Sequence, residues 1–438
     1  MSSQESKVKQ SLRASFLDGV FAVCMMGFTQ DYFIPFLLLV GGTTFHVGIL
    51  NSIPNLAAAL IQLPSADVTV KTGSRTKIIN TFVFFQAVML VPMAILALKG
   101  GTTPFAFIIL VTLFAAIGAF AMPPWGSLMS DLVPEKQRGE YFGWRNRILG
   151  FIMVAMGFVA GFILHTMENI NIYHGFAIIF LFAFIFRIMS WYFLTRMHEP
   201  PLEHKKEDQF TLIMFLRRIK ESNFAKFVLF VGLLNFTVNI ASPFFAVFML
   251  RDLHFSYLLY TVVTITATLA VYLFMRRWGR HADRVGNLKV IQFTAPIVSI
   301  LPLLWVVNHH PLFLILIQIL AGFAWAGFNL CASNFIFDAV SPAKRTRCIA
   351  YFNVINGVAL CLGALIGGFL IEHLPTLFGY QLLTLFVISS ALRLGVVFVL
   401  PHRLKEVRPV DSLKSDDLFF SMIGIKPLLG IDRKTIRY

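Results

Sequence analysis

Long apolar runs separated by short polar connections limit the possible folds of this chain more than any other feature. Each run is about 20 residues long, enough for a helix to cross the hydrocarbon core of a bilayer. Of the 438 residues, 57% are hydrophobic and only 13% are charged. Because a helix satisfies its own backbone hydrogen bonds in lipid, we predict an all-α, polytopic membrane protein. A β-barrel would instead show segments of about ten residues with alternating polarity.

The apolar runs predict twelve transmembrane helices in two groups of six. The expected spans are 15–40, 45–64, 78–98, 104–127, 146–166, 174–195, 223–250, 256–275, 290–308, 311–337, 349–371 and 380–400. This segmentation gives a first bundle at 14–195, a linker at 196–222 and a second bundle at 223–400. Residues 1–13 and 401–438 form polar ends.

The basic residues predict the orientation in the membrane. The net charge is +15, and most Lys and Arg residues lie in the two ends and in alternate loops. Only Lys99 and Arg251 fall in the opposite set of loops. By the positive-inside rule, both termini are expected in the cytoplasm, in a multi-pass protein of the cytoplasmic membrane. The charge is therefore explained by the lipid bilayer, and no nucleic-acid partner is expected.

The two groups of spans carry matching motifs. The segment Gly27–Phe36 corresponds without a gap to Asn235–Phe244, with Phe, Thr, Asp or Asn, Pro and Phe in register. Arg187 lies deep in the sixth span, and Arg393 lies at the same depth in the twelfth. Two inner loops also match in order: 71–75 with 284–288, and 131–142 with 338–352. We therefore predict a duplicated six-helix unit related by a pseudo-twofold axis.

The loop after the eighth span carries the most specific motif. It contains Gly279, Asp283, Arg284, Gly286 and a basic residue, Lys289. This pattern resembles the signature loop of the major facilitator superfamily, and the resemblance in span number and loop lengths extends from about residue 14 to 400. The resemblance implies a secondary transporter that moves a small organic solute by alternating access. It does not identify a subfamily, and we expect a monomer.

In the superfamily this loop latches the two halves together at the inner face. The matching position in the first half is Val70, so the carboxylate is absent there. We therefore expect Asp283 to dock at the start of the fifth span, where Arg145 and Arg147 are available. The alternative is an ordinary charged loop.

Two arginines inside predicted spans need partners, because a charged side chain in lipid costs about 2.5–3.5 kcal/mol on insertion scales. An acidic residue ends the fourth helix of each half. We expect Arg187 to pair with Asp131 and Arg393 to pair with Asp338. The rival interpretation is that each arginine extends to the inner interface.

Asp31 is the best candidate for transport chemistry, because it lies well inside the first span. Burial favours the protonated form of a carboxyl group, which suits the binding of H⁺ near neutral pH. Its counterpart in the second half, Asn239, cannot titrate. The alternative is a carboxylate satisfied by Thr29, Gln30 or a tyrosine, without a role in transport.

Several other polar or aromatic residues lie on helices that line the central cavity in the superfamily. An amide inside a span either faces that cavity or bonds a neighbouring helix. The candidates for binding substrate or H⁺, besides Asp31, are Gln30, Asn55, Asn239, Trp325 and Asn329.

Other functional classes receive little support from the sequence. The four cysteines have no metal-ligand spacing, His309 and His310 lack a third ligand, and we expect no metal or cofactor. A polytopic enzyme would need a catalytic cluster at one membrane face, and none is found. A lipid flippase or scramblase on the same fold remains the main alternative to a solute transporter.

The linker contains apolar residues at helical spacing, within 210–219, beside basic residues. This pattern predicts either a short helix on the inner membrane surface or a linker helix without a lipid role. The tail is expected to be cytoplasmic and partly disordered.

Overall fold

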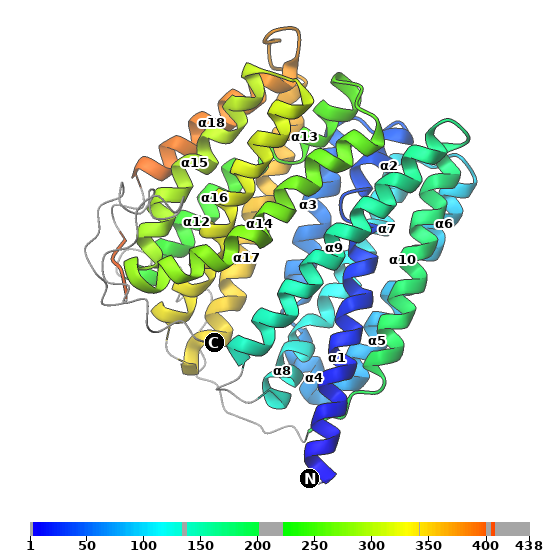
Figure 1. The fold of residues 1–438 in the computed structure, drawn as a ribbon, viewed down its shortest axis with the longest axis vertical. Helices are drawn as coiled ribbons and strands as arrows, with labels where there is room; N and C mark the ends of the chain where they lie inside the picture. Colours follow the sequence, from blue (N-terminus) through cyan, green and yellow to red (C-terminus); the bar gives the residue numbers. More distant parts are fainter. Residues whose placement is uncertain (1–2, 134–137, 201–221, 341, 400–403, 408–438) are drawn as a thin grey trace, which may run out of the picture.

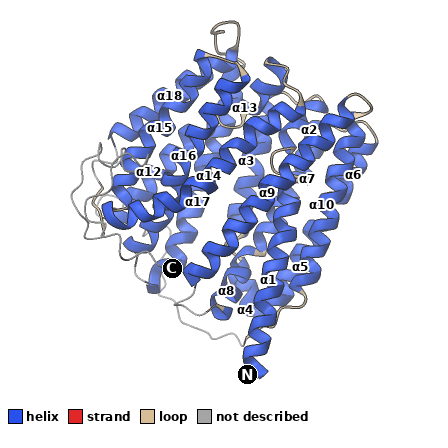
Figure 2. Ribbon diagram, viewed as in Figure 1, coloured by secondary structure: helices blue, strands red, loops and turns tan. Residues whose placement is uncertain are grey.

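The computed structural model describes residues 3–133, 138–200, 222–340, 342–399 and 404–407. Helices form the regular secondary structure of these residues, together with one isolated bridge between Leu377 and Tyr380 (Figure 2). The all-α prediction is confirmed. The predicted helix within 210–219 and the tail from 408 onward lie outside the described residues.

The helices of the first bundle follow the predicted spans closely. They are α1 (Ser3–Gly27), α2 (Phe33–Leu39), α3 (Thr44–Ile61), α4 (Ser65–Thr72), α5 (Arg75–Val88), α6 (Leu90–Leu98), α7 (Pro104–Phe120), α8 (Met122–Leu132), α9 (Arg138–Glu168) and α10 (Ile172–Leu194). Some membrane spans consist of two consecutive helices; α5 and α6, for example, form one span.

The second bundle contains the remaining helices. They are α12 (Asn223–Asn239), α13 (Phe244–Val247), the π-helical turn η2 (Phe248–Asp252), α14 (Tyr257–Val285), α15 (Asn287–Val307), α16 (Pro311–Ala339), α17 (Pro342–Ile371) and α18 (Gln381–Val399). The two bundles stand side by side in Figure 1.

Eleven helices among the described residues are long and apolar enough to cross a membrane. They correspond to the second to twelfth predicted spans. The first predicted span is formed by α1 and α2, which are separated by a turn at 28–32 and therefore do not make one uninterrupted helix. The second bundle has a matching interruption at 240–243, so both breaks fall within the duplicated motif. Pro35 and Pro243 lie at or just after these breaks, where a missing N–H is tolerated.

Close helix contacts join the two bundles. In one contact α3 packs along α17, where Gly48 faces Ala364 and, further along, Ala59 faces Gly357. A Cβ atom at Gly48 would lie 2.7 Å from the carbonyl oxygen of Ala364, so this approach requires glycine.

In a second contact α9 packs against α14. Gly161 faces Thr261, and Gly150 faces Tyr272. At Gly143, two turns further along α9, a Cβ atom would meet nothing within 4 Å. The close contact between α9 and α14 therefore ends before the first turns of α9.

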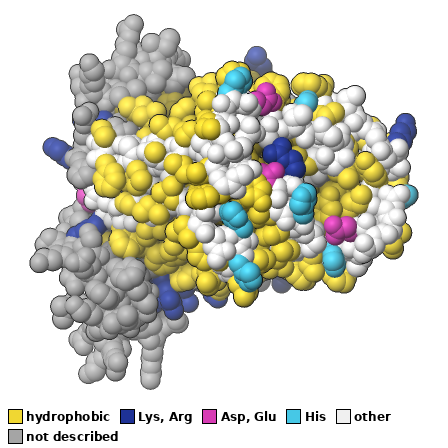
Figure 3. Space-filling model, turned by 90° about the horizontal axis from the view of Figure 1, so that it is seen from above, with side chains coloured by type: hydrophobic (Ala, Val, Ile, Leu, Met, Phe, Trp, Pro, Cys, Tyr) yellow, Lys and Arg dark blue, Asp and Glu magenta, His cyan; other side chains and the backbone are white. Residues whose placement is uncertain are grey.

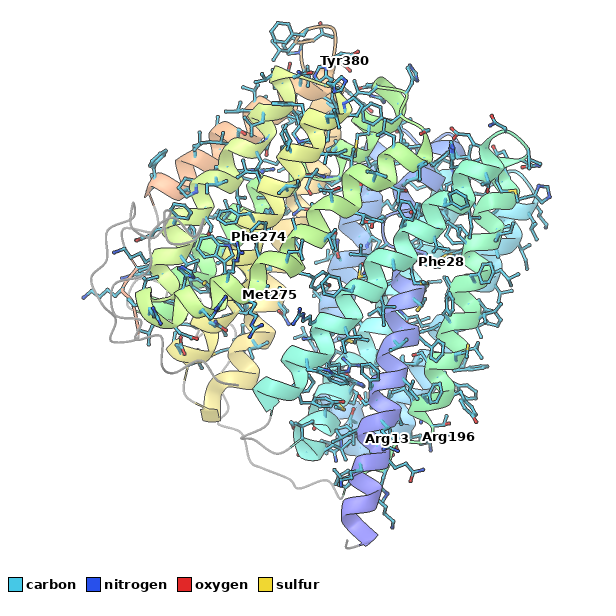
Figure 4. The ribbon with its side chains drawn as sticks, in the orientation of Figure 1. Arg13, Phe28, Arg196, Phe274, Met275 and Tyr380 are labelled. Carbon is cyan, nitrogen blue, oxygen red and sulfur yellow. The ribbon has the colours of Figure 1, made fainter. Side chains whose placement is uncertain are left out.

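The two ends of the molecule differ. We call the end that carries Arg13 and Arg196 the basic face, and the end near Tyr380 the short-loop face (Figure 4). Viewed from above, the short-loop face shows scattered histidine, acidic and basic side chains among apolar ones (Figure 3). The close α9–α14 contact thus lies nearer the short-loop face, and Gly143 lies towards the basic face.

Many large apolar side chains are exposed on the outside of the bundles. Phe105, Ile109, Leu316 and Phe369 each expose more than half of their surface. A water-soluble protein rarely exposes so many neighbouring apolar groups, whereas lipid covers them in a membrane.

Candidate functional site

A cavity of about 450 Å³ lies between the two bundles, and we call it the interface cavity. The first bundle contributes side chains from the broken first span and from α3, and the second contributes α12–α16 and α18. Its polar and aromatic lining includes Gln30, Asp31, Asn51, Tyr260, Thr264, Gln318, Trp325 and Arg393. Three of the predicted site residues, Gln30, Asp31 and Trp325, therefore share one cavity.

Asp31, whose side chain ends in a carboxylate, lies in the turn between α1 and α2 and lines this cavity. Among the described residues, no protein group donates a hydrogen bond to that carboxylate. The hydroxyl of Thr29 donates to the backbone oxygen of Met25, and the hydroxyl of Tyr260 donates to the backbone oxygen of Asp31 at 2.7 Å. The tyrosine contact thus fixes the backbone of Asp31 and leaves its side chain available.

Hydrogen bonds across the bundle interface surround Asp31. The hydroxyl of Tyr32, a fully buried residue, donates to Gly157 O at 2.5 Å and lies 3.0 Å from the hydroxyl of Thr261. On the other side, the hydroxyl of Ser52 donates to Cys361 O at 2.9 Å. These contacts hold both sides of the interface together around the break in the first span.

Asn239 lines neither of the two cavities and hydrogen-bonds the other bundle. Its side-chain oxygen accepts a hydrogen bond from Asn51 at 2.9 Å, and its nitrogen donates to Asn235 O at 3.2 Å. Asn235 in turn donates to the side chain of Asn356 at 2.8 Å. Asn239 is buried and bonds the two bundles together, as an interhelical amide can. Because the matching residue in the first half is Asp31, the duplicated position supplies a link in one half and an open carboxylate in the other.

A second cavity, of about 760 Å³, lies within the first bundle, and we call it the N-bundle cavity. It is lined from α1–α3, α5 and α7–α10, and it shares Gln30 and Asn51 with the interface cavity. The predicted candidate Asn55 lines it as well. Asn329 lines neither cavity, although its side chain is exposed.

The predicted pairing of Arg187 with Asp131 is wrong. Arg187 donates to the side chains of Gln86 at 2.8 Å and Ser190 at 3.0 Å. Asp131 instead binds Arg75, with 2.5 Å between its oxygen and the Nη1 atom of Arg75. Arg187 lies about 10 Å of helix rise before the end of α10, too deep in the bundle for the acid at the end of α8.

The predicted pairing of Arg393 with Asp338 is also wrong. Arg393 donates to the hydroxyl of Ser389 at 3.1 Å and to the backbone oxygens of Val298 and Val238 at 3.1 and 3.2 Å. Asp338 accepts a hydrogen bond from Asn287 at 2.7 Å. Arg393 is only 3% exposed, so the alternative of reaching the interface is wrong too. Two backbone carbonyls, that of Val238 just before the break at 240–243 and that of Val298 in α15, take the place of a carboxylate.

The predicted docking of Asp283 on the fifth span does not occur in this conformation. Arg145 donates to Ser15 O at 3.1 Å, and its guanidinium lies 5.1 Å from the centre of the Trp125 ring. Among the described residues, neither Arg145 nor Arg147 forms an ion pair with Asp283. The physical reason is the early end of the α9–α14 contact, beyond which Arg147 is exposed.

Of the two glycines in the signature loop, only Gly286 is required by the local structure. Gly286 has φ +89°, in the left-handed region, and it separates α14 from α15 as a tight turn. A Cβ atom at Gly279 would lie 3.6 Å from Leu330, which is an ordinary contact. Gly279 is therefore not required for close packing here. Asp283 and Arg284 are exposed at the end of α14.

Two glutamates cap the N-termini of matching helices, and we had not predicted a role for either of them. Glu199 accepts hydrogen bonds from the backbone N–H groups of Arg75 and Thr76 and from the hydroxyl of Ser74. Burial alone would raise the pKa of Glu199, but these donors outweigh it and lower the pKa to about 2. Glu406 accepts from Leu288 N at 2.7 Å in the second half. The signal was present in the sequence, because both acids follow the last helix of a bundle.

Asp18 was also missed. It lies on α1, is 5% exposed and accepts a hydrogen bond from Ser190 at 2.6 Å. The sequence signal was an acid near the start of the predicted first span. Among the described residues, no group of three His, Cys, Asp or Glu side chains could hold a metal ion.

Comparison with known proteins identifies the family. The family model described as Major Facilitator Superfamily matches residues 19–281 and 227–429. The chain belongs to the major facilitator superfamily. It is therefore a polytopic secondary transporter of small solutes and not an enzyme. No curated protein matches the chain.

Solved structures of this superfamily share the fold at low sequence identity. A mutant form of the nucleoside transporter NupG has a TM-score of 0.72 and 17% identity over 90% of this chain and 100% of that chain. A bacterial homolog of the human lysosomal transporter Spinster, inward-facing and occupied, has a TM-score of 0.65 and 14% identity over 91% and 98%. The human organic anion transporter MFSD10 has a TM-score of 0.58 and 14% identity over 90% and 99%. These matches confirm the twelve-span architecture.

Proposed function

We propose that this chain moves a small organic solute across the cytoplasmic membrane by alternating access, with Asp31 as the group that binds H⁺, another cation or a polar group of the substrate. Both termini lie in the cytoplasm, as the distribution of Lys and Arg indicates. The moving parts are residues 14–195 and 223–400, and the functional unit is a monomer.

The single observation that carries this proposal is the environment of Asp31. This residue lines a cavity between the two bundles, and no described protein group donates a hydrogen bond to its carboxylate. Ionisable groups inside a membrane bundle are costly unless they are paired or functional. A cation or a substrate donor would supply the missing partner.

The packing of the bundles supports alternating access. Gly48 and Gly161 allow α3 and α9 to lie against the other bundle near the short-loop face, whereas Gly143 meets open space towards the basic face. Rocking the bundles about these contacts would exchange the open side, which is the motion expected for duplicated transporters. The solved relatives include transporters of nucleosides and organic anions, so a panel of polar organic solutes is the appropriate starting set.

The first test is uptake of such a panel into proteoliposomes, with and without a pH gradient. We expect Asp31→Asn to lower gradient-driven uptake by about tenfold or more, because the amide cannot take up a cation. Asp31→Glu should retain part of the activity. The variant Asp252→Asn, at the exposed Arg251 pair, is a suitable control.

Uptake that is unchanged by Asp31→Asn at every pH would remove Asp31 from the mechanism. A parallel lipid-flip assay on the same liposomes separates the solute transporter from the amphiphile alternative. Flipping of labelled lipid without uptake of any solute would favour a flippase.

A further inference from the structure

The charged side chains that line the N-bundle cavity do not balance. They are Arg145, Arg187 and Asp18, two cations and one anion. Asp18 is held by the hydroxyl of Ser190, which also accepts a hydrogen bond from Arg187. Among the described residues, Asp18 forms no direct ion pair with either arginine. The carboxylate therefore compensates the two guanidinium groups only through space and through one bridging hydroxyl.

Hydrogen-bond donors remain available on Arg145. The side chain is 7% exposed, and its Nε–H is buried without an acceptor. One terminal nitrogen donates to Ser15 O, which leaves the remaining donors of a planar fork that suits carboxylate or phosphate oxygens. A buried charged donor without an acceptor is unfavourable, so an acceptor supplied by a ligand would be stabilising here.

The rest of the cavity can accommodate the body of an organic molecule. The Trp125 ring lies beneath the Arg145 guanidinium, and Phe142, Phe33 and Phe114 add apolar surface. The volume of about 760 Å³ is in the range of small-molecule sites. The amide of Asn146 provides a further polar contact. A flat or apolar body with one anionic group matches this lining.

We infer that the N-bundle cavity binds an organic anion, with its carboxylate or phosphate between Arg145 and Arg187 and its apolar part against Trp125. This inference rests on the proposed transport function and specifies its substrate class. Asp18 positions Arg187 through Ser190. Its negative charge also offsets part of the positive charge of the two arginines, because charges interact strongly at short range in a cavity of low dielectric constant.

The test is ligand-induced thermal stabilisation of the purified full chain. The probes are a fixed panel of aromatic and aliphatic carboxylates and phosphate esters, each with its neutral amide or alcohol and its cationic amine. We expect stabilisation by members of the anionic set only. Arg145→Gln and Arg187→Gln should each weaken that binding by about 10- to 100-fold, as expected for loss of a charged hydrogen-bond partner.

Two further variants make the result specific. Asp18→Asn should bind the anion about threefold tighter or more, because one negative charge leaves the cavity. Arg196→Gln removes an exposed arginine at the end of α10 and should leave the affinity unchanged. A variant that fails to fold is recognised by its melting temperature without ligand, and Arg145→Lys then replaces Arg145→Gln as the weaker perturbation.

Stabilisation by the neutral or cationic members, or by none of the anions, would overturn the inference. So would anion binding that survives both arginine substitutions. These outcomes can be distinguished from a failure of the proposed function. Uptake of a neutral solute would support the transporter and reject the anion site. Anion binding without uptake of any solute would support the anion site and reject the transport function.

Discussion

At the scale of single residues, the buried arginines show where sequence reasoning succeeds and where it stops. Their presence inside the spans and their need for partners could be predicted, since an unpaired guanidinium is costly in lipid. Their partners could not. Arg187 is satisfied by Gln86 and Ser190. Arg393 is satisfied mainly by two backbone oxygens. Neutral acceptors of this kind depend on how helices rotate against one another, which spacing in the sequence does not determine.

Arg75 gives the clearest case of a missed pairing. It is 1% exposed, and it binds Asp131 and Glu199 and donates to Pro200 O. Arg75 and Asp131 both lie in inner loops that match between the halves, but we expected Arg187 to be the partner of Asp131. The correct choice follows from position along the membrane normal, because Arg75 and Asp131 both lie at the basic face.

Glu199 predicts a pH dependence of stability. Its folded pKa of about 2 lies below the ordinary value of 4.5, so its stabilising effect is present above about pH 4.5 and is lost as the pH falls towards 2. Glu199→Gln should lower the stability by about 1–2 kcal/mol at neutral pH, as for loss of a charged helix cap. The melting temperature of variant and parent, measured from pH 7 downward, should converge in acid.

The exposed Glu372→Gln variant is the matched control and should change the melting temperature little at any pH. A Glu199→Gln deficit that stays constant down to pH 3 would contradict the assignment of the cap to an ionised carboxylate.

At the scale of helices, the apolar runs predicted the spans well because length and hydropathy are what a bilayer selects. The differences occur where a helix leaves the apolar layer. α14 continues to Val285, well past the predicted end at 275, because Arg276, Arg277 and the following polar residues remain helical outside the apolar stretch. The break at 28–32 was not predicted either, although the proline and the duplicated motif mark its position.

Replacement of a glycine that lies between two closely packed helices is expected to disrupt their packing. Gly48→Val would place a side chain against the carbonyl oxygen of Ala364 and separate α3 from α17. We expect a destabilisation of about 1–3 kcal/mol, as for other overpacked contacts, and a corresponding loss of uptake. The measurement is the melting temperature together with initial uptake rates. Gly395→Val on α18 has open space and should leave both within error.

At the scale of the whole molecule, duplication and the signature loop together were sufficient to predict the superfamily fold. The substrate was not predictable, because the cavity lining comes from helices whose rotation the sequence leaves open. The anionic character proposed for the cargo depends on Asp18, Arg145 and Arg187 meeting in one cavity, and only Arg187 among them was singled out as a buried charge.

We propose that Asp283 meets the fifth span only in the state in which the basic face is closed. In a background without the natural cysteines, Arg147→Cys combined with Asp283→Cys should cross-link with a short bifunctional reagent during turnover and then stop uptake. The measurement is the cross-linked fraction against the uptake rate. Efficient cross-linking that leaves transport intact would contradict the closure, and Arg196→Cys with Asp283→Cys is the control pair.

The hydroxyl of Tyr260 grips the main chain of Asp31 from the opposite bundle. Opening of the short-loop face would move α14 away from the first bundle and break this hydrogen bond. The bond that opening must break is therefore made by the same residue whose carboxylate has no protein donor. A cation bound at Asp31 that stabilises or destabilises this turn would thereby change the free energy of opening. Cation binding and opening would then be coupled through a single peptide group.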